Sequence, residues 1–357
     1  MEVTMSENIY KQLAEHLDRL PIPFPATDSG VELRILKRWF TPEEAEIALS
    51  MNGYPEAVPV IAERLGKKPD AMQPILADMS KKGLIFRISK GEKQFYNIVP
   101  LAEGMWEFHM NSNDKEILQD LREYIDYFME KSWYGTPTTQ HRIIPISQSL
   151  SGNQDIMSYD QAEAIIKSQT KISVAHCICR KEHKLLGQGC NHLSEACMAF
   201  GTGAYFYIDN GLGREISQEE ALKILHKAMD SGLVLQPGNG KKVWGICMCC
   251  GCCCGLLKAL KKMDKPAAVA HTSFYAEVLV DNCTACGLCG ERCPMDAINI
   301  DDTAIVNRDR CIGCGVCVGT CSVDAVELRQ KDEAHRYVPP ADVTEMQMKI
   351  ARERGLL

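Results

Sequence analysis

The sequence predicts an α+β protein made of several domains, and three observations lead to this fold class. A chain of 357 residues is long enough for two or three hydrophobic cores. Segments with the apolar spacing of amphipathic helices alternate with short apolar segments typical of strands. All eighteen cysteines lie between Cys177 and Cys321, so residues 1–176 differ in composition from the rest of the chain.

The bulk composition indicates a metal-binding protein of the cytoplasm. A formal net charge of −7 gives no overall attraction to nucleic acid or to anionic membranes. We expect no membrane span, because no segment approaches the roughly 20 consecutive apolar residues that one needs. The opening MEVTMSENIY also lacks the pattern of a signal peptide. Eighteen cysteines in such a chain indicate metal ligands rather than disulfides.

Residues 1–30 are predicted to form an N-terminal helix and a linker. The segment SENIYKQLAEHLDRL places Ile9, Leu13, Leu17 and Leu20 on one helical face. The prolines of PIPFP then end the helix and favour an extended chain. We expect the helix to dock on the rest of the protein.

Residues 31–110 are predicted to contain helices followed by a β-hairpin. Thr41-Pro42-Glu43-Glu44 is a capping box with proline at the first helical position. Residues 58–99 then predict a short helix, a second helix and two strands joined by a turn at Lys90-Gly91. This order resembles the winged helix of many bacterial transcription regulators, which implies either DNA binding or docking to a protein.

The charge and the helix sequence of this winged-helix-like segment favour different partners. Between Val58 and Pro100, eight Lys or Arg residues stand against four acidic residues, an excess that would attract nucleic acid. However, the expected recognition helix, KPDAMQPILADMSKKG, has a proline near its middle and no Arg or Asn to read bases. We therefore favour protein docking and expect no nucleic-acid partner.

Residues 111–275 are predicted to form a helix and then an α/β, cysteine-rich cluster domain. Strands are expected at RIIPIS, KISVAH and LVLQ, and a strand between turns at GTGAYFYIDNGLG. Helices are expected at SYDQAEAIIK, capped by Ser158 and Gln161, and at ISQEEALKILHKAMDSG, capped by Ser217 and Glu220. The cysteines lie at or just beyond strand ends, where loops on a rigid scaffold would present them as ligands. The first helix is rich in core-forming residues: Ile117, Leu118, Leu121, Tyr124, Ile125 and Phe128.

The first cysteine group of this domain has the spacing C-x-C-x10-C-x6-C. Four thiols are enough to hold one cubane iron–sulfur cluster. Zinc is the alternative, since His176, His183 and His192 lie close in sequence and imidazole suits zinc. Three basic residues follow the C-x-C pair and would raise the potential of an anionic cluster or dock an acidic partner: Arg180, Lys181 and Lys184. The four cysteines are Cys177, Cys179, Cys190 and Cys197.

The second group lies in ICMCCGCCCG, which carries six cysteines in ten residues. Neighbouring side chains diverge, so about three of the six can reach one cluster and other ligands must come from elsewhere. We expect the two groups to share two clusters that use eight of the ten thiols, with the two unused thiols in the Cys252–Cys254 run. One middle cluster is the alternative. The six cysteines are Cys247, Cys249, Cys250, Cys252, Cys253 and Cys254.

Residues 276–330 contain a duplicated motif. CTACGLCGERCP and CIGCGVCVGTCS both have the spacing C-x2-C-x2-C-x3-C, and they start 28 residues apart at Cys283 and Cys311. Such a loop covers three corners of a 4Fe–4S cubane, and the fourth cysteine of each run binds the other cluster. The segment resembles bacterial two-cluster ferredoxins, except that Ser322 stands where proline is usual. One ligand set is Cys283, Cys286, Cys289 and Cys321, and the other is Cys311, Cys314, Cys317 and Cys293.

Two wider resemblances bear on function. The ferredoxin motifs together with the cysteine-rich middle region are similar to a family of 4Fe–4S binding proteins of anaerobes. The two C-C-G triplets, Cys249–Gly251 and Cys253–Gly255, also resemble the CCG domains of heterodisulfide reductases. That second resemblance implies clusters that face a substrate, although the triplets of those domains lie in widely separated stretches. Residues 331–357 complete the chain as a tail or helix.

The sequence therefore predicts an iron–sulfur electron-transfer protein. It would act as a ferredoxin-like carrier or as a subunit of an anaerobic oxidoreductase, with a redox protein as partner. One alternative is a redox-sensing winged-helix transcription regulator. Another is a reductase with a catalytic cluster in the middle domain. Motifs for nucleotide binding, such as G-x-G-x-x-G and the P-loop, and the zinc-protease motif H-E-x-x-H are absent from the sequence.

Overall fold

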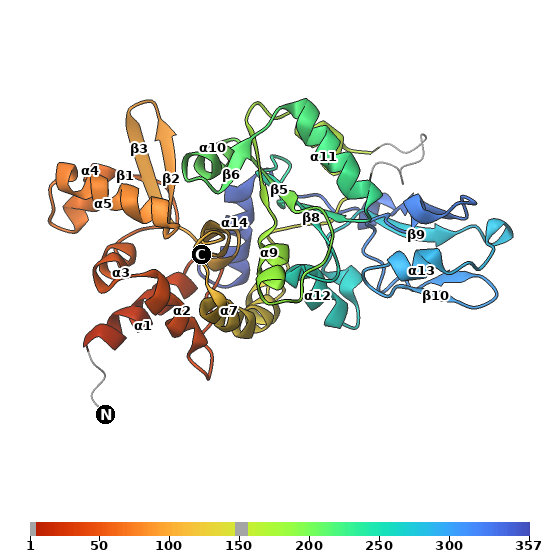
Figure 1. The fold of residues 1–357 in the computed structure, drawn as a ribbon, viewed down its shortest axis with the longest axis horizontal. Coiled ribbons are helices and arrows are strands. Elements are labelled where there is room, and N and C mark those ends of the chain that lie inside the picture. The colour runs from red at the N-terminus through yellow and green to blue at the C-terminus, as the bar shows by residue number, and fades with distance from the viewer. Residues whose placement is uncertain (1–4, 147–155) are drawn as a thin grey trace. The chain divides into compact units, whose positions relative to one another are not determined.

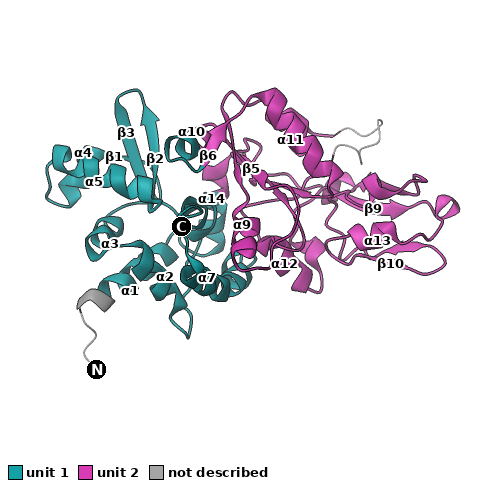
Figure 2. Cartoon of the chain, viewed as in Figure 1, with its two compact units in different colours: residues 1–136, 206–212, 347–357 teal, residues 137–205, 213–346 magenta. Residues whose placement is uncertain are grey.

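The computed structural model describes residues 5–146 and 156–357 and confirms the predicted α+β class (Figure 1). It divides into two compact units (Figure 2). Unit 1 comprises residues 1–136, 206–212 and 347–357, and unit 2 comprises residues 137–205 and 213–346. The finer division into five segments stays a prediction. Every helix among the described residues is too short or too polar to span a lipid bilayer.

Unit 1 is mainly helical. The predicted capping box is confirmed, because Thr41 accepts the backbone N–H of Glu44 while the Glu44 carboxylate accepts that of Thr41. Arg34 on α2 pairs with Asp120 on α7 at 3.0 Å and so joins these two helices. The helices wholly within this unit are α1 (Met5–Asp18), α2 (Val31–Trp39), α3 (Pro42–Leu49), α4 (Val58–Arg64), α5 (Pro69–Lys82), α6 (Trp106–Phe108) and α7 (Lys115–Phe128).

A small antiparallel sheet completes unit 1. Its strands are β1 (Glu56–Ala57), β2 (Ile85–Lys90) and β3 (Lys93–Ile98), in the order β1-β3-β2. The predicted hairpin is therefore confirmed, and its turn is at Gly91, whose φ is +59°. Phe206 packs against Phe86 of this hairpin, with ring centroids 4.7 Å apart. The segment GTGAYFYIDNGLG forms helix α10 (Thr202–Asp209), so the strand expected there was wrong.

Unit 2 is built on a five-stranded antiparallel sheet with the order β6-β4-β5-β8-β7. Helix α11 packs on β4 and β5, and one face of the sheet forms the core together with α8 and α11. The strands are β4 (Ile172–His176), β5 (Glu195–Phe200), β6 (Gly213–Glu215), β7 (Val234–Pro237) and β8 (Gly245–Cys249). The helices are α8 (Ala162–Lys167), α9 (Ile178–Leu185), α11 (Gln218–Asp230) and α12 (Gly255–Lys262).

Two local expectations in unit 2 were wrong. Residues 142–146 form no strand and make one isolated bridge to β7, from Ile144 to Leu235, and Ser147 lies outside the described residues. Ser158 does not cap a helix, since Ser158–Asp160 is a 3₁₀ turn and α8 begins after Gln161. The buried pair of Arg142 and Asp160, 3.1 Å apart, holds both segments in place instead.

The C-terminal part of unit 2 consists of two short antiparallel ladders around the duplicated motifs. They are β9 (Phe274–Val278) with β12 (Val326–Gln330), and β10 (Ile298–Ile300) with β11 (Ala304–Val306). The duplication extends to the backbone, because Asp296 and Asp324, 28 residues apart, both have a φ of +49°. Helix α13 (Leu288–Arg292) lies within the first motif, and helix α14 (Val343–Glu353) belongs partly to each unit.

Candidate iron–sulfur sites

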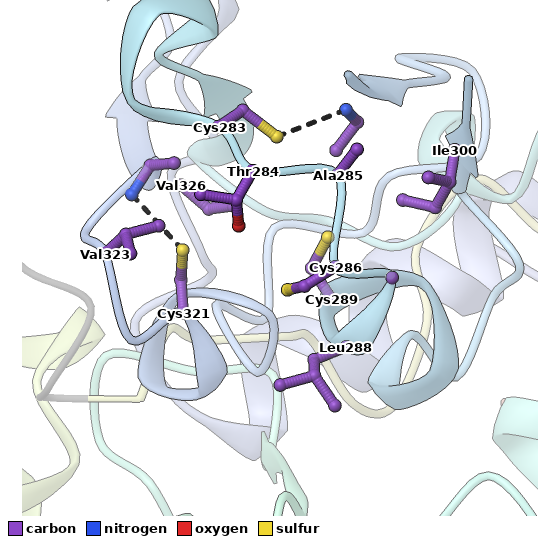
Figure 3. A pocket seen from close by; sticks show the side chains of 13 residues that line it. Cys283, Thr284, Ala285, Cys286, Leu288, Cys289, Ile300, Cys321, Val323 and Val326 are labelled. Carbon is purple, nitrogen blue, oxygen red and sulfur yellow. Dashed lines mark hydrogen bonds between the residues drawn. The ribbon is translucent and has the colours of Figure 1, made fainter. Parts of the chain in front are cut away.

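The first C-terminal cysteine set lines one pocket, with an empty volume of about 320 Å³ (Figure 3). It contains Cys283, Cys286, Cys289 and Cys321. Two backbone amides point at its sulfurs, because Ala304 N donates to Cys283 Sγ at 3.4 Å and Ala325 N donates to Cys321 Sγ at 3.2 Å. The Ala304 amide lowers the pKa of Cys283.

The second C-terminal set lines a matching pocket of about 330 Å³. It contains Cys311, Cys314, Cys317 and Cys293. Ala276 N donates to Cys311 Sγ and Ala297 N donates to Cys293 Sγ, each at 3.3 Å. In both sets the cysteine from the other motif accepts the amide four residues after it, as expected for a duplicated structure.

Both pockets fit a 4Fe–4S cluster. Such clusters are held by four cysteine thiolates and are tuned by hydrogen bonds to their sulfurs. Each pocket offers four thiols and at least two backbone N–H donors. Gly313 is required beside the second pocket, because a Cβ there would lie 2.3 Å from the carbonyl oxygen of Phe274.

The ten middle cysteines form two groups that cut across the sequence motifs. We call the first the four-thiol group. Its Sγ atoms all lie within 4.8 Å of one another, and its members are Cys190, Cys250, Cys252 and Cys253. Cys190 Sγ lies 3.9 Å from Cys250 Sγ and 3.7 Å from Cys253 Sγ. Cys190 therefore lies next to three cysteines of ICMCCGCCCG and apart from the other cysteines of its own sequence motif.

The remaining cysteines form what we call the six-thiol group. Side-chain hydrogen bonds connect them in the order Cys177, Cys179, Cys254, Cys249, Cys247 and Cys197. Cys177 is the N-cap of α9 and Cys254 is the N-cap of α12, so two helix N-termini meet at this group. Helix N-termini favour negative charge, which suits thiolate ligands.

Hydrogen bonding among these thiols separates their pKa values. Cys179 and Cys249 both lower the pKa of Cys254 well below its usual value, and the Gln236 amide also approaches it, with Nε2 3.6 Å from Sγ. The pKa values of Cys179 and Cys249 move the opposite way. Contact with Cys179 lowers the pKa of Cys177 to about 7.

Two of the three nearby histidines have other partners. His176 Nδ1 lies 2.9 Å from Ser194 Oγ, and His183 Nδ1 lies 2.8 Å from the carbonyl oxygen of Cys179. Among the described residues, the group whose ligand atoms could surround one metal ion consists of cysteines alone. A donor set made of thiolates favours an iron–sulfur cluster, whereas imidazole donors would have favoured zinc.

Arg180 joins the two middle groups. Its guanidinium donates to Cys250 Sγ at 3.4 Å and to the carbonyl oxygen of Met248 at 3.1 Å. Its positive charge also lowers the pKa of Cys177 and so favours the thiolate there. Of the three basic residues after the C-x-C pair, it is the buried one, with an exposed fraction of 5 %.

The four-thiol group lies directly beside the second C-terminal set. A Cβ on Gly251, between Cys250 and Cys252, would lie 3.1 Å from the Cβ of Pro294, which follows Cys293. A backbone hydrogen bond of 3.1 Å from Ile146 N to the carbonyl oxygen of Cys314 also joins the two parts of unit 2. Sequence spacing did not indicate this contact, because it depends on how distant segments pack.

Comparison with known proteins identifies the C-terminal part of the chain. A family model described as a 4Fe-4S dicluster domain matches residues 264–326. Neither the curated proteins nor the solved structures gave a match. The matched residues include both duplicated motifs, so this chain carries a C-terminal ferredoxin-like domain that binds 4Fe–4S iron–sulfur centres.

Proposed function

We propose that this chain is an iron–sulfur electron-transfer protein, working as a carrier or as a subunit of an anaerobic oxidoreductase. The observation that carries the proposal is the placement of the thiols in unit 2. All eighteen cysteines belong to one of four groups, the two C-terminal sets, the four-thiol group and the six-thiol group. Bound iron–sulfur clusters supply one-electron redox chemistry at such sites.

Two clusters are assigned to the C-terminal domain. The ligands proposed for the first are Cys283, Cys286, Cys289 and Cys321, and those for the second are Cys311, Cys314, Cys317 and Cys293. The shared pockets and the matching N–H···S bonds support this crossed assignment. The protein contributes four thiolates, amide donors and an apolar wall to each site.

Two further clusters are assigned to the middle region. The four-thiol group supplies all four ligands of one, supported by the short distances among its sulfurs. The other is assigned to Cys177, Cys179, Cys249 and Cys254. These four thiols lie at the N-termini of α9 and α12 and at the end of β8, whereas Cys197 and Cys247 lie within strands. The two unused thiols in this proposal are therefore Cys197 and Cys247, whereas the sequence led us to expect them in the Cys252–Cys254 run.

The helical part of unit 1 is assigned to docking a redox partner protein. Helices α3, α4 and α5 come before the hairpin of β2 and β3, and the sheet of unit 1 has the order β1-β3-β2. This arrangement supports a winged-helix-like unit. The sequence of α5 has no Arg or Asn to read bases, and its exposed Asp78 pairs with Lys82 at 2.8 Å, which reduces the charge that Lys82 could offer to a phosphate. These residues favour a protein partner over DNA.

The test is to purify the full chain without oxygen and measure iron and acid-labile sulfide. We expect about sixteen iron atoms per chain, four for each of four cubanes. About eight would contradict the middle clusters while leaving the C-terminal domain intact. Cys286→Ser and Cys252→Ser form a matched pair of variants, because both residues are exposed. Each variant should lose about a quarter of the iron, with the loss from a different cluster in the EPR spectrum.

A further inference from the structure

Cys197 and Cys247 face each other across neighbouring strands. They are register partners in the antiparallel pair β5 and β8. Phe200 N donates to the carbonyl oxygen of Trp244 at 2.8 Å, which makes that facing pair a hydrogen-bonded one. Because the two kinds of pair alternate, Cys197 and Cys247, three positions along, form a non-hydrogen-bonded pair.

The backbone geometry of such a pair permits a disulfide. Facing residues of a non-hydrogen-bonded pair have Cα atoms about 4.5 Å apart. Disulfides join residues whose Cα atoms are about 4.4–6.8 Å apart, a range that includes this typical spacing. Directly facing residues of an antiparallel pair have side chains on the same face of the sheet, so the two thiols lie side by side.

The pair is also surplus to the nearest cluster site. The six-thiol group contains two thiols more than one cubane needs. Cys197 joins this group through Cys247, and Cys247 in turn contacts Cys249. Cys249 and Cys254 are buried, whereas Cys197 and Cys247 are partly exposed.

We propose that Cys197 and Cys247 form a redox-active dithiol that couples two-electron sulfur chemistry to one-electron transport through the neighbouring cluster site. The inference rests on the proposed function. On oxidation, two S–H bonds break and one S–S bond forms, and two protons leave to solvent. The two electrons leave one at a time to an iron–sulfur carrier. The reverse reaction consumes two electrons and two protons. Compounds that exchange electrons with such a pair by thiol exchange are disulfides.

The experiment uses the anaerobically purified full chain with its clusters. The protein is equilibrated in dithiothreitol redox buffers of graded potential, free thiols are alkylated, and the digest is examined by mass spectrometry. We expect a peptide pair linked through Cys197 and Cys247 at oxidising poise, lost at reducing poise, with iron content constant. Absence of this linked pair at every poise in protein with full iron would overturn the proposal.

Variants separate surplus thiols from ligands. We expect Cys197→Ser, Cys247→Ser and the double variant to keep the wild-type iron content, whereas Cys254→Ser loses about a quarter of it. A similar loss in both single variants would make the pair ligands and overturn the proposal. Wild-type protein with about eight iron atoms would instead contradict the middle clusters of the proposed function, so the two failures are distinguishable.

Discussion

At the scale of single residues, the surroundings of Arg180 indicate where negative charge is expected in the two middle cysteine groups. It is buried, and no carboxylate in the described ranges, 5–146 and 156–357, forms an ion pair with it. A buried guanidinium needs a counter-charge. The groups within its reach are thiols, so the negative charge of a cluster site is the natural partner.

Replacing Arg180 should therefore change a potential and leave the iron in place. A nearby cation stabilises the more negative, reduced form, so Arg180→Gln should lower the reduction potential of a middle cluster by about 60 mV, a tenfold change for one electron. Redox titration followed by EPR measures the shift. Arg180→Lys, which keeps the charge, should recover part of it. An unchanged potential in Arg180→Gln would contradict this placement of the charge.

His109 gives unit 1 a dependence on pH. It is buried, its ring stacks on Trp39 with centroids 4.2 Å apart, and its Nδ1–H donates to the carbonyl oxygen of Met105 at 2.7 Å. Burial lowers the pKa of His109 to about 4. The folded protein then binds fewer protons than the unfolded chain below about pH 6.5, so stability is full above that pH and falls as the pH drops toward 4.

The expected loss is about 1 kcal/mol between about pH 7 and about pH 5.5. Urea unfolding of the full chain, followed by tryptophan fluorescence, measures it. His109→Phe keeps a ring against Trp39 but cannot titrate, so its unfolding free energy should change less over the same interval. Equal pH dependence in the variant and the wild type would assign the effect to other groups.

At the scale of elements, the two cluster loops differ in how tightly they are packed. Gly287 has a φ of +83° and nothing within 4 Å of a Cβ placed on it, whereas Gly313, with a φ of +66°, has the Phe274 carbonyl oxygen 2.3 Å from such a Cβ. An alanine at either position adopts a left-handed conformation, at about 1 kcal/mol. At Gly313 the clash with the backbone adds about 1–3 kcal/mol.

Gly313→Ala should consequently lower the melting temperature and the iron content more than Gly287→Ala. The two variants are matched, because each adds one methyl group to a loop of the duplicated motif. Thermal unfolding under argon and iron analysis of the same samples provide the comparison. Equal effects would mean that the close approach to Phe274 does not constrain the second loop.

The elements also show why some sites could be predicted from the sequence and others could not. Each C-terminal motif supplies three thiols from one loop, so spacing alone predicts the cysteine sets that the two pockets bring together. The middle groups depend on pairing between β5 and β8, which are separated by the 44 residues between Phe200 and Gly245, and on where α9 and α12 begin. Spacing could not show that Cys190 would join Cys250, because that contact is purely tertiary.

Secondary structure was also predicted correctly where its cause is local and wrongly where it depends on distant packing. The capping box of Thr41 and Glu44 is local, and its prediction was confirmed. The apolar run AYFYI was expected to be a strand, but it forms α10 after Gly201, whose φ is +56°. Short apolar runs fit either a helix or a strand, and packing decides between them. Phe206 packs on Phe86 and Phe108 in the helical form.

At the scale of the whole molecule, the contact between Gly251 and Pro294 places the second C-terminal set next to the four-thiol group. Pro294 lines the pocket of the second set, so we expect the first set to lie further from the middle region. This order, from the first set through the second to the four-thiol group, predicts that paramagnetic centres in the last two interact when both are reduced.

Two variants test that order. Cys314→Ser removes a ligand proposed for the second cluster, and Cys289→Ser removes one proposed for the first, and both residues are buried. Each should lose about four iron atoms per chain. Spin–spin broadening of the EPR signal from the four-thiol group should decrease in Cys314→Ser and stay at the wild-type level in Cys289→Ser, since the former removes the C-terminal centre beside that group. Unchanged broadening in Cys314→Ser, or an equal decrease in both variants, would contradict the order, because adjacency to Pro294 is what distinguishes the two C-terminal sites.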